Sequence, residues 1–351
     1  MALAPSFMKA VITTEDHNIK VQELSNLSVS QISVPSIESE RQILIHSAGI
    51  NPTDWKHAKH LSPEGTISGC DLAGVVEDSG RSKEVKVGDR LAAFVHGGNY
   101  KNYGAFAEYA LVEPDTSIRL PEYMSFDQGA TLGIPLGTAA FALYHKLKLP
   151  EPGVVIPRSF PVLIWSGSSA VGQYAIQLAK LSGLSVVTTA SFQHHERLRS
   201  LGADSVFDYH DPHVSEKIKE ATHNDLAYAL DCVSSEESLK SVTDAFGEKG
   251  GKVAVLLSPE GKDIRKDAEV VPVLVYTCLG KEFTFAGKKY PASADDRQFY
   301  ERWVKMANGL LEEKKIVTLP TEDRGGLEGV ASAFKDMEEG KNKGVKYVIH
   351  P

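Results

Sequence analysis

A glycine- and serine-rich loop at residues 167–172 has the residue types and the spacing that bind phosphate. The loop consists of Gly167, Ser168, Ser169, Ala170, Val171 and Gly172. The apolar run Val162–Trp165 precedes it, and a helical pattern that ends near Ser182 follows it. In a strand–loop–helix unit of this kind, free backbone N–H groups at the positive end of the helix bind the pyrophosphate of a dinucleotide.

The residue types in this loop have physical reasons to be there. We expect Gly167 to allow the tight turn and Gly172 to allow the helix to pack closely on the strand. Ser169 occupies the middle position of the motif, where its hydroxyl adds a donor for phosphate. The alternative is a Gly/Ser-rich turn without a ligand, but the strand before the loop and the helix after it favour a dinucleotide.

The residues that follow the second strand bear on which dinucleotide binds. NAD-binding folds usually carry an Asp or Glu about 20 residues beyond the first glycine, where it binds the ribose hydroxyls. The stretch 186–195 contains no acidic residue, and Arg197 follows it closely. Charge-assisted hydrogen bonds from such a neutral or basic end suit a 2′-phosphate, so we expect NADPH rather than NADH. For His194 and His195 the alternative is a solvated helix start.

The hydrophobic pattern predicts that this loop lies in a parallel α/β sheet. From about residue 127 to residue 276, strand-like runs alternate with helical segments, which is typical of a doubly wound sheet. We expect strands at Val162–Trp165, Ser185–Ala190, Ser205–Asp208, Tyr228–Cys232 and Lys252–Leu257. We expect the intervening helices at Ala170–Ser182, His194–Ser200 and Glu236–Phe246.

The residues before and after this sheet have a different pattern. Short strand-like runs separated by Gly, Pro, Asn and Asp predict a β-rich barrel or sandwich. We expect its strands at Met8–Ile12, Gln42–Ser47, Leu72–Glu77, Arg90–Phe94 and Ala107–Val112. The tail predicts helices near Asp295–Lys314 and Leu327–Glu339, and strands at Val317–Leu319 and Lys346–Ile349. We expect the last strand to pair with the first domain.

A chain of 351 residues exceeds the size of one hydrophobic core, so we expect two domains. We assign residues 1–126 and 277–351 to the β-rich domain, and residues 127–276 to the dinucleotide-binding domain. Small-molecule sites are commonly built between domains, and we expect the active site in the cleft between these two.

Composition excludes several classes of protein. The net charge is −8 and the sequence has no basic run, which argues against a nucleic-acid binder. Apolar runs fall short of the ~20 residues that span a bilayer, and the start lacks the pattern of a secretory signal. Three cysteines, none in a C-x-x-C pair, exclude a disulfide framework and a Cys₄ zinc knuckle. We expect a protein of the cytoplasm.

Several motifs, in order and spacing, resemble the medium-chain dehydrogenase/reductase superfamily from Met8 to the end of the chain. They are the phosphate loop and the segments 50–56 (INPTDWK), 69–76 (GCDLAGVV), 87–90 (VGDR), 133–140 (GIPLGTAA) and 201–204 (LGAD). The resemblance implies a Rossmann doubly wound sheet plus a β-rich GroES-like catalytic domain. Within the superfamily, the chain is most similar to the zinc-free enoyl reductases that act in trans with fungal polyketide synthases, to which quinone oxidoreductases are related.

The same resemblance bears on metal. Zinc members carry a cysteine ligand where this chain has Asn51, and Gly-His-Glu where it has Gly69, Cys70 and Asp71. No cysteine lies near residues 133–135, where another ligand belongs. A catalytic zinc needs three protein ligands and an open position, so we expect no metal. We interpret Cys70 as a packed core thiol.

Without zinc, the acceptor must be polarised by conjugation. Hydride then goes to the β-carbon of an α,β-unsaturated carbonyl or enoyl thioester, and hydrogen-bond donors stabilise the enolate. Our first hypothesis is an NADPH-dependent enoyl reductase of secondary metabolism, with a small enoyl or enone substrate and a polyketide synthase as partner. The alternatives are an NADPH quinone oxidoreductase and a non-catalytic cofactor-binding protein. The sequence leaves a monomer and a homodimer equally open.

By resemblance, Lys56, Thr138 and Asn51 are the catalytic candidates. Lys56 is expected to stabilise an oxyanion or deliver a proton, and Thr138 to touch the nicotinamide. The alternatives are an exposed lysine that ends a turn, and a hydroxyl satisfied within its own helix; Asp54 is either a nicotinamide contact or a helix cap. Besides the phosphate loop, the resemblance implies cofactor contacts at Asn51, Pro52, Thr53, Asp54, Thr138, Ser191, His194, Tyr209, Leu256, Leu257, Gly344 and Val345.

Overall fold

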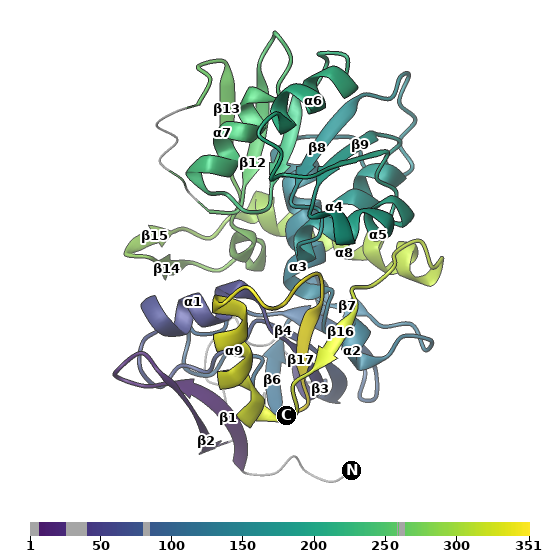
Figure 1. Ribbon diagram of the computed structural model, residues 1–351. Coiled ribbons are helices and arrows are strands. Elements are labelled where there is room, and N and C mark those ends of the chain that lie inside the picture. Colours follow the sequence, from purple (N-terminus) through teal and green to yellow (C-terminus); the bar gives the residue numbers. More distant parts are fainter. Residues whose placement is uncertain (1–6, 26–40, 80–84, 258, 260–263) are drawn as a thin grey trace. The chain divides into compact units, whose positions relative to one another are not determined.

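The computed structural model describes residues 7–25, 41–79, 85–257, 259 and 264–351 (Figure 1). Two compact units divide the chain: Met1–Ile134 with Tyr276–Pro351, and Pro135–Val275. Residues 127–134 belong to the first unit, where helix α2 (Phe126–Gly129) packs against β3 and β4 of its sheet. Among the helices in the described part of the chain, none is long and apolar enough to cross a membrane.

The first unit is built on a seven-stranded sheet. Its strands run in the order β16-β17-β3-β4-β5-β7, and β6 also pairs with β3. The bounds are β3 Arg41–Gly49, β4 Asp71–Asp78, β5 Arg90–Phe94, β6 Tyr109–Val112, β7 Ile118–Arg119, β16 Thr321–Asp323 and β17 Lys346–Ile349. β17 lies antiparallel to β3, which confirms that the last strand pairs with the first part of the chain.

Two hairpins and several helices complete the first unit. The hairpins are β1 (Phe7–Thr13) with β2 (Ile19–Ser25), and β14 (Phe283–Phe285) with β15 (Lys288–Tyr290). The helices are α1 (Pro52–His60), α2, α8 (Ala294–Glu312) and α9 (Val330–Glu338). Short 3₁₀ turns lie at η3 (Pro114–Thr116), η6 (Val275–Leu279) and η7 (Leu327–Gly329).

The expected strand at Val317–Leu319 is wrong. The ladder with β17 begins at Pro320, whose carbonyl accepts the N–H of Lys346 at 2.8 Å, and it continues through Thr321–Asp323. Because Pro320 has no N–H, it cannot donate to the ladder, and the strand forms on its C-terminal side.

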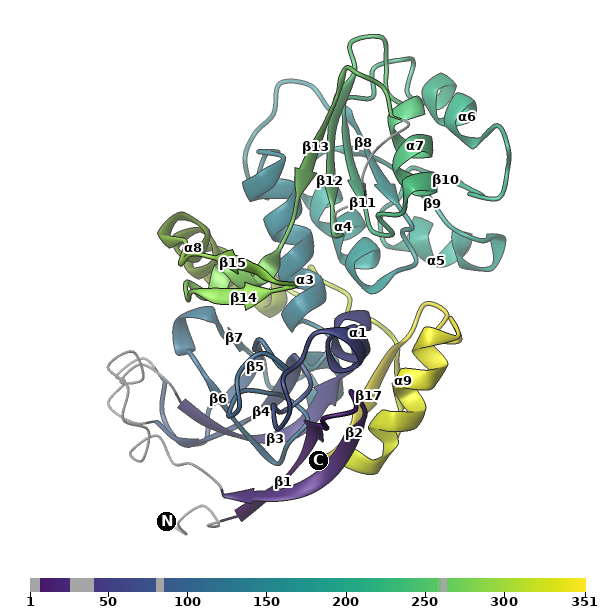
Figure 2. The ribbon, with the colours of Figure 1, turned by 90° about the vertical axis from the view of Figure 1, so that its left-hand side faces the viewer.

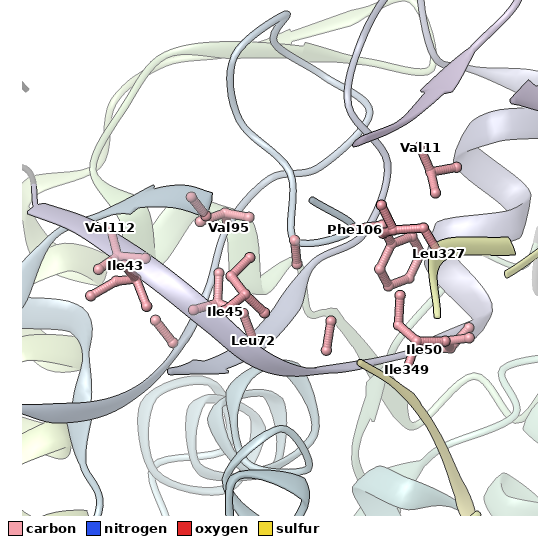
Figure 3. Packing of buried hydrophobic residues seen from close by; sticks show 14 of the residues in the cluster. Val11, Ile43, Ile45, Ile50, Leu72, Val95, Phe106, Val112, Leu327 and Ile349 are labelled. Atoms are coloured by element: carbon pink, nitrogen blue, oxygen red, sulfur yellow. The ribbon is translucent and has the colours of Figure 1, made fainter. Parts of the chain in front are cut away.

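Alternation along the strands builds the core of the first unit. In β3, Ile43 and Ile45 are buried while His46 is exposed, as expected when successive side chains point to opposite faces. Both belong to one hydrophobic cluster with Leu72 of β4 and Ile349 of β17; in Figure 3, Ile45 lies beside Leu72, and Ile349 lies beside Ile50. Burying side chains of this size contributes ~1.5–3 kcal/mol each, so the sheet itself is the scaffold of this unit.

The second unit is a six-stranded parallel sheet in the order β10-β9-β8-β11-β12-β13 (Figure 2). The strands are β8 Pro161–Trp165, β9 Ser185–Thr189, β10 Ser205–Phe207, β11 Tyr228–Asp231, β12 Gly251–Val255 and β13 Ala268–Pro272. This is the order of two mononucleotide-binding halves that meet at the first strand, β8, beside β11. The doubly wound sheet predicted from the sequence is confirmed.

Helices connect these strands. They are α4 (Ala170–Leu181), η5 (Phe192–His194), α5 (His195–Ser200), α6 (Val214–Ala221) and α7 (Glu236–Asp244). The predicted strands and helices of this sheet agree with the structure to within two residues at each end, but α6 and β13 were not predicted. Helix α3 (Gly133–Ala140) leads directly into a π-helical turn, η4 (Phe141–Lys146).

Gly74 offers a test of the packing in the first unit. A Cβ atom there would lie 2.0 Å from the carbonyl oxygen of Leu44 on the paired strand. We therefore expect Gly74→Ala to lower the free energy of unfolding by about 1–3 kcal/mol, the usual cost of overpacking, in urea titrations. The matched control is Gly309→Ala on α8, where a Cβ would meet nothing within 4 Å. It should raise the free energy of unfolding by about 1 kcal/mol. Equal losses of stability in both variants would contradict the close packing of Gly74 against β3.

Candidate functional site

The phosphate-binding loop joins β8 to α4 in the second unit. Ser166, the first residue after β8, has a φ of 62°, in the left-handed region. A Cβ atom on Gly167 would lie 2.1 Å from the Thr188 hydroxyl on β9. The expectation that Gly167 makes the turn is therefore corrected. Ser166 adopts the turn's left-handed backbone, and Gly167 lets the loop pack against β9.

Ser169 is the N-cap of α4. Its hydroxyl oxygen accepts the N–H of Gly172 at 3.0 Å and donates to the carbonyl of Ser166 at 2.8 Å. The expectation that this hydroxyl is a free donor for phosphate is therefore wrong, because it already closes the loop. A Cβ on Gly172 would lie 2.4 Å from the Ser166 carbonyl, which explains the last glycine.

Backbone N–H groups supply the hydrogen-bond donors for phosphate that the Ser169 hydroxyl does not. At the start of the 12-residue helix α4, the N–H groups of Ala170 and Val171 lack the intrahelical acceptors that later residues have. They lie at the positive end of the helix, where an anionic phosphate is stabilised. The loop therefore fits the pyrophosphate of a dinucleotide.

After β9, some side chains support the protein structure and others are partly exposed at the predicted cofactor site. The ring of His195 is buried, and its Nε2 lies 2.9 Å from the carbonyl of Ala190, so it supports the backbone. Arg197 donates from Nε to the amide oxygen of Gln173 on α4, at 2.7 Å. Ser191 and His194 are half-buried; Ser191 is the N-cap of η5, and His194 is its last residue. These two lie where the sequence predicts contacts to a 2′-phosphate.

A cavity of about 1050 Å³ opens in the second unit. It is lined by residues that follow β8, β10 and β11, namely Trp165, Tyr209 and Val233, and it extends between α6 and α7. Crevices at the carboxyl ends of parallel strands are where doubly wound sheets bind ligands. Tyr209 is 45% exposed and lines this cavity, whereas Ser191, His194 and the phosphate loop do not.

The other expected cofactor contacts lie in several elements. In the second unit, Thr138 is buried in α3, Leu257 is half exposed, and the N–H of Leu256 donates to the Ser234 hydroxyl at 2.7 Å. In the first unit, Gly344 has a φ of 74°, which favours glycine. Val345 packs against the hydrophobic core of that unit.

Helix α1 carries the predicted catalytic lysine of the first unit. Asn51 is its N-cap, and the carboxylate of Asp54 accepts the Asn51 backbone N–H at 2.7 Å. Asp54 is therefore not the N-cap itself but the capping-box partner of Asn51, three residues into the helix. Lys56 lies inside the helix and is half-buried, with Nζ 5.6 Å from the centre of the Trp55 ring. It is not an exposed lysine at the end of a turn.

A buried ion pair lies beside the start of α1. The carboxylate of Asp71 accepts from Lys346 Nζ at 2.8 Å and from the side-chain amide of Asn51 at 2.9 Å. Its other oxygen accepts the N–H of Ile134 at 2.6 Å. Lys346 Nζ also donates to the amide oxygen of Asn51. Both ends of the Asn51 amide are thus engaged with this ion pair.

A second polar chain links α1 to the 3₁₀ turn η6. The hydroxyl of Tyr276 lies 3.0 Å from the Thr53 hydroxyl and 3.3 Å from Cys70 Sγ. Thr53 in turn lies 3.2 Å from Nε2 of His57, whose Nδ1 faces the carbonyl of Gly97 at 3.2 Å. A carbonyl only accepts, so Nδ1 carries the proton and Nε2 accepts from Thr53. Burial lowers the pKa of His57, which keeps this ring neutral.

The acidic groups in this region have displaced pKa values. Burial raises the pKa of Asp54 to about 7, against the smaller lowering by the Cys70 thiol, the Asn51 N–H and the charge of Lys346. Burial, and then the charge of Asp54, raise the pKa of the Cys70 thiol. Cys70 is therefore a neutral, buried thiol, as the sequence predicts.

These residues do not fit a zinc ion. Within the described residues, Cys70 belongs to no group of three ligand side chains whose ligand atoms lie within 4.8 Å of one another. The ammonium of Lys346 already lies against Asn51 and Asp71, and it repels a second cation.

The sequence analysis did not identify Lys346, Tyr276 or His57 as site residues. Lys346 carried a readable signal, since it opens an otherwise apolar strand, Lys346–Ile349, that is buried throughout. Tyr276 and His57 carried none. Their chain of hydrogen bonds joins residues more than 200 positions apart in the sequence.

Comparisons with known proteins agree with this geometry. Residues 38–122 match the family described as alcohol dehydrogenase GroES-like domain, and residues 170–300 match the family described as zinc-binding dehydrogenase. The trans-enoyl reductase ACTTS2 of Alternaria alternata is 37% identical over 336 residues, 93% of this chain and 96% of the relative. The trans-enoyl reductase TOXD of Cochliobolus carbonum is 41% identical over 285 residues, 80% of this chain and 93% of the relative.

Solved structures share the fold. The CurK enoyl reductase matches with a TM-score of 0.75 over 99% of both chains, at 19% sequence identity. The fold class predicted from the sequence, a GroES-like domain with a Rossmann sheet, is therefore confirmed.

The raised pKa of Asp54 predicts how stability varies with pH. An unfolded aspartate titrates near pH 4, and the folded Asp54 near 7, so wild-type stability falls as pH rises between these values. Asp54→Asn keeps an acceptor for the Asn51 N–H and removes the titration. The free energy of unfolding of Asp54→Asn, relative to that of wild type, should therefore rise by on the order of 4 kcal/mol between pH 4 and pH 7. Denaturant unfolding at each pH measures this difference.

Asp16→Asn is the matched control. Asp16 is exposed, and hydrogen bonds from Thr14 and Asn18 lower its pKa, so its contribution has the opposite sign. A difference between wild type and Asp54→Asn that stays constant from pH 4 to 7 would contradict the assignment.

Proposed function

Because the chain belongs to the medium-chain dehydrogenase/reductase superfamily, and within it to the trans-enoyl reductases, we propose that it is a zinc-independent NADPH-dependent enoyl reductase. When bound, NADPH supplies the hydride, which goes to the β-carbon of an α,β-unsaturated carbonyl or enoyl thioester. The observation that carries the proposal is the dinucleotide loop together with the buried ammonium of Lys346, which contacts Asn51 and Asp71.

The electrostatics around Asn51 support metal independence. Lewis-acid catalysis needs a metal with an open position, and the donor set here lacks the ligands for it. An acceptor polarised by conjugation needs only donors that stabilise the enolate as negative charge develops. The reaction class is therefore reduction of a conjugated double bond rather than of an isolated ketone.

In this proposal the second unit holds the cofactor. The N–H groups of Ala170 and Val171 bind the pyrophosphate, and Ser191 with His194 binds the 2′-phosphate. Tyr209 lies beside the adenosine part. The absence of an acidic residue from 186–195 supports NADPH over NADH, since a carboxylate there would repel the phosphate.

Lys56 is the proposed acid and oxyanion donor. Its ammonium stabilises the enolate oxygen and supplies a proton toward the α-carbon. Its place inside α1 fixes the base of the side chain, while the half-buried stem leaves the head mobile enough to reach a substrate. Thr138 is the proposed hydroxyl contact to the nicotinamide, on α3.

The resemblance also supports a setting. We assign the enzyme to the cytoplasm, where it reduces intermediates of a polyketide synthase, its proposed partner. A carrier-bound enoyl thioester is the substrate chemistry that such a partner delivers. Reduction of a quinone on the same fold is the alternative reaction.

The test follows NADPH and NADH consumption by purified, chelator-treated protein with three acceptors: an enoyl thioester, a simple quinone and a ketone. Fast NADPH loss with the thioester is the expected result. Turnover with the quinone alone would replace the proposal by a quinone reductase. Activity that disappears with the chelator and returns with zinc would contradict metal independence.

Lys56→Ala should lower turnover far more than it changes cofactor affinity. Removing a donor to a developing oxyanion costs on the order of 100-fold in kcat, whereas the NADPH Kd should stay within about twofold. The matched control is Lys59→Ala on the same helix, whose exposed ammonium pairs with Glu338. Equal losses of turnover and NADPH affinity in Lys56→Ala would contradict the role.

Ser191→Asp tests the cofactor preference. A carboxylate beside the 2′-phosphate adds like-charge repulsion, so the NADPH Kd should rise by about tenfold or more while the NADH Kd changes little. Fluorescence titration measures both constants. Ser332→Asp, an exposed position on α9, controls for the added charge. An equal change in both constants would place the 2′-phosphate elsewhere.

A further inference from the structure

Lys346 stands out among the lysines of the first unit by its burial. Its side chain is 2% exposed, and it pairs with Asp71, which is fully buried. A buried ion pair loses the hydration of two charges, and replacing it with apolar residues of similar size is often neutral or stabilising. A contribution to stability therefore does not explain the presence of this ion pair.

The pair joins the first turns of two helices. Through Asn51, Lys346 and Asp71 hold the N-cap of α1, which carries Lys56. Through the N–H of Ile134, Asp71 holds the first turn of α3. Thr138 lies on the same helix, four residues further along.

Two glycines leave the space that this arrangement needs. A Cβ on Gly49 would lie 2.7 Å from Lys346 Cε and 2.2 Å from the carbonyl oxygen of Ala130. A Cβ on Gly133 would lie 2.4 Å from an oxygen of Asp71. The backbone around the ion pair is thus built to admit both charged side chains.

We propose that Lys346 is a positioning residue, whose ammonium orients the Asn51 amide and the Asp71 carboxylate and so holds the helix starts that present Lys56 and Thr138. This inference rests on the proposed function only for the roles of Lys56 and Thr138. Lys346 acts within the polar network as an internal cation that pairs with the Asp71 carboxylate. It acts on the reaction through α1 and α3.

Two variants separate positioning from stability. Lys346→Met removes the ammonium but leaves the Asp71 charge unpaired, which destabilises the fold. The double variant Lys346→Met/Asp71→Asn removes both charges, and so it should keep a wild-type unfolding midpoint. Lys341→Met, an exposed lysine of the same tail that pairs with Asp336 and Glu339, is the matched control.

Hydrogen exchange tests the proposal without any turnover. Peptides that cover α1 and the start of α3 should exchange faster in the double variant than in wild type, by about tenfold or more. Peptides of α7, in the other unit, should be unchanged, and Lys341→Met should match wild type throughout. Unchanged exchange at α1 and α3, or an equal increase in α7, would overturn the proposal.

Kinetics give the second readout. With the acceptor that wild type reduces fastest, the double variant should lose about tenfold or more in kcat per NADPH-binding molecule. Its NADPH Kd should stay within about twofold. A kcat near that of wild type would overturn the positioning role. Failure of the proposed function would show separately, as a wild-type enzyme that does not reduce the enoyl thioester.

Discussion

The buried carboxylate of Asp71 is the constraint on which the rest of the first unit's polar site depends. It accepts from a side-chain ammonium, a side-chain amide and a backbone N–H, and these come from β17, the N-cap of α1 and the start of α3. An unpaired charge at this depth would cost several kcal/mol, so a buried carboxylate at position 71 needs donors around it. Their placement sets where two helices begin.

At the neighbouring Asp54, burial outweighs the charges of this ion pair. Lys346 is in direct contact with Asp71, and its charge lowers the pKa of Asp54 less than burial raises it. Asp54 therefore holds a proton near neutral pH, beside a thiol and a tyrosine that are also neutral. The network combines one compensated charge pair with a set of neutral hydrogen-bonding groups.

The sequence predicts the second unit better than the first, for physical reasons. Parallel strands and helices have local periodicities, so β8, α4 and the phosphate loop are readable from a window of about 20 residues. Within that loop, the roles of Gly167 and Ser169 were not readable, because they depend on Thr188 of the next strand and on the cap geometry. The motif indicates the ligand class, and the packing assigns the individual atoms.

In the first unit the predicted residues were found on the expected segments, but their partners were not predictable. The motif around Asn51 is visible in the sequence, whereas its amide bonds to residues 20 and 295 positions away. Strands β14 and β15 have three residues each, and the side chains of β2 are exposed or only half-buried, so these strands leave little local signal. Only the strand pairing of the tail brings Lys346 to Asp71. A charged residue at the start of an otherwise apolar strand, as at Lys346, can indicate a buried polar site.

The most direct test of the enoyl reductase assignment is the fate of a labelled hydride. Purified enzyme would be given NADPH that carries deuterium on the transferring face of C4, with an enoyl thioester in ordinary water. We predict one deuterium at the β-carbon of the saturated product, located by NMR, and a solvent proton at the α-carbon. Deuterium at the carbonyl carbon, or a product without deuterium, would contradict the assignment.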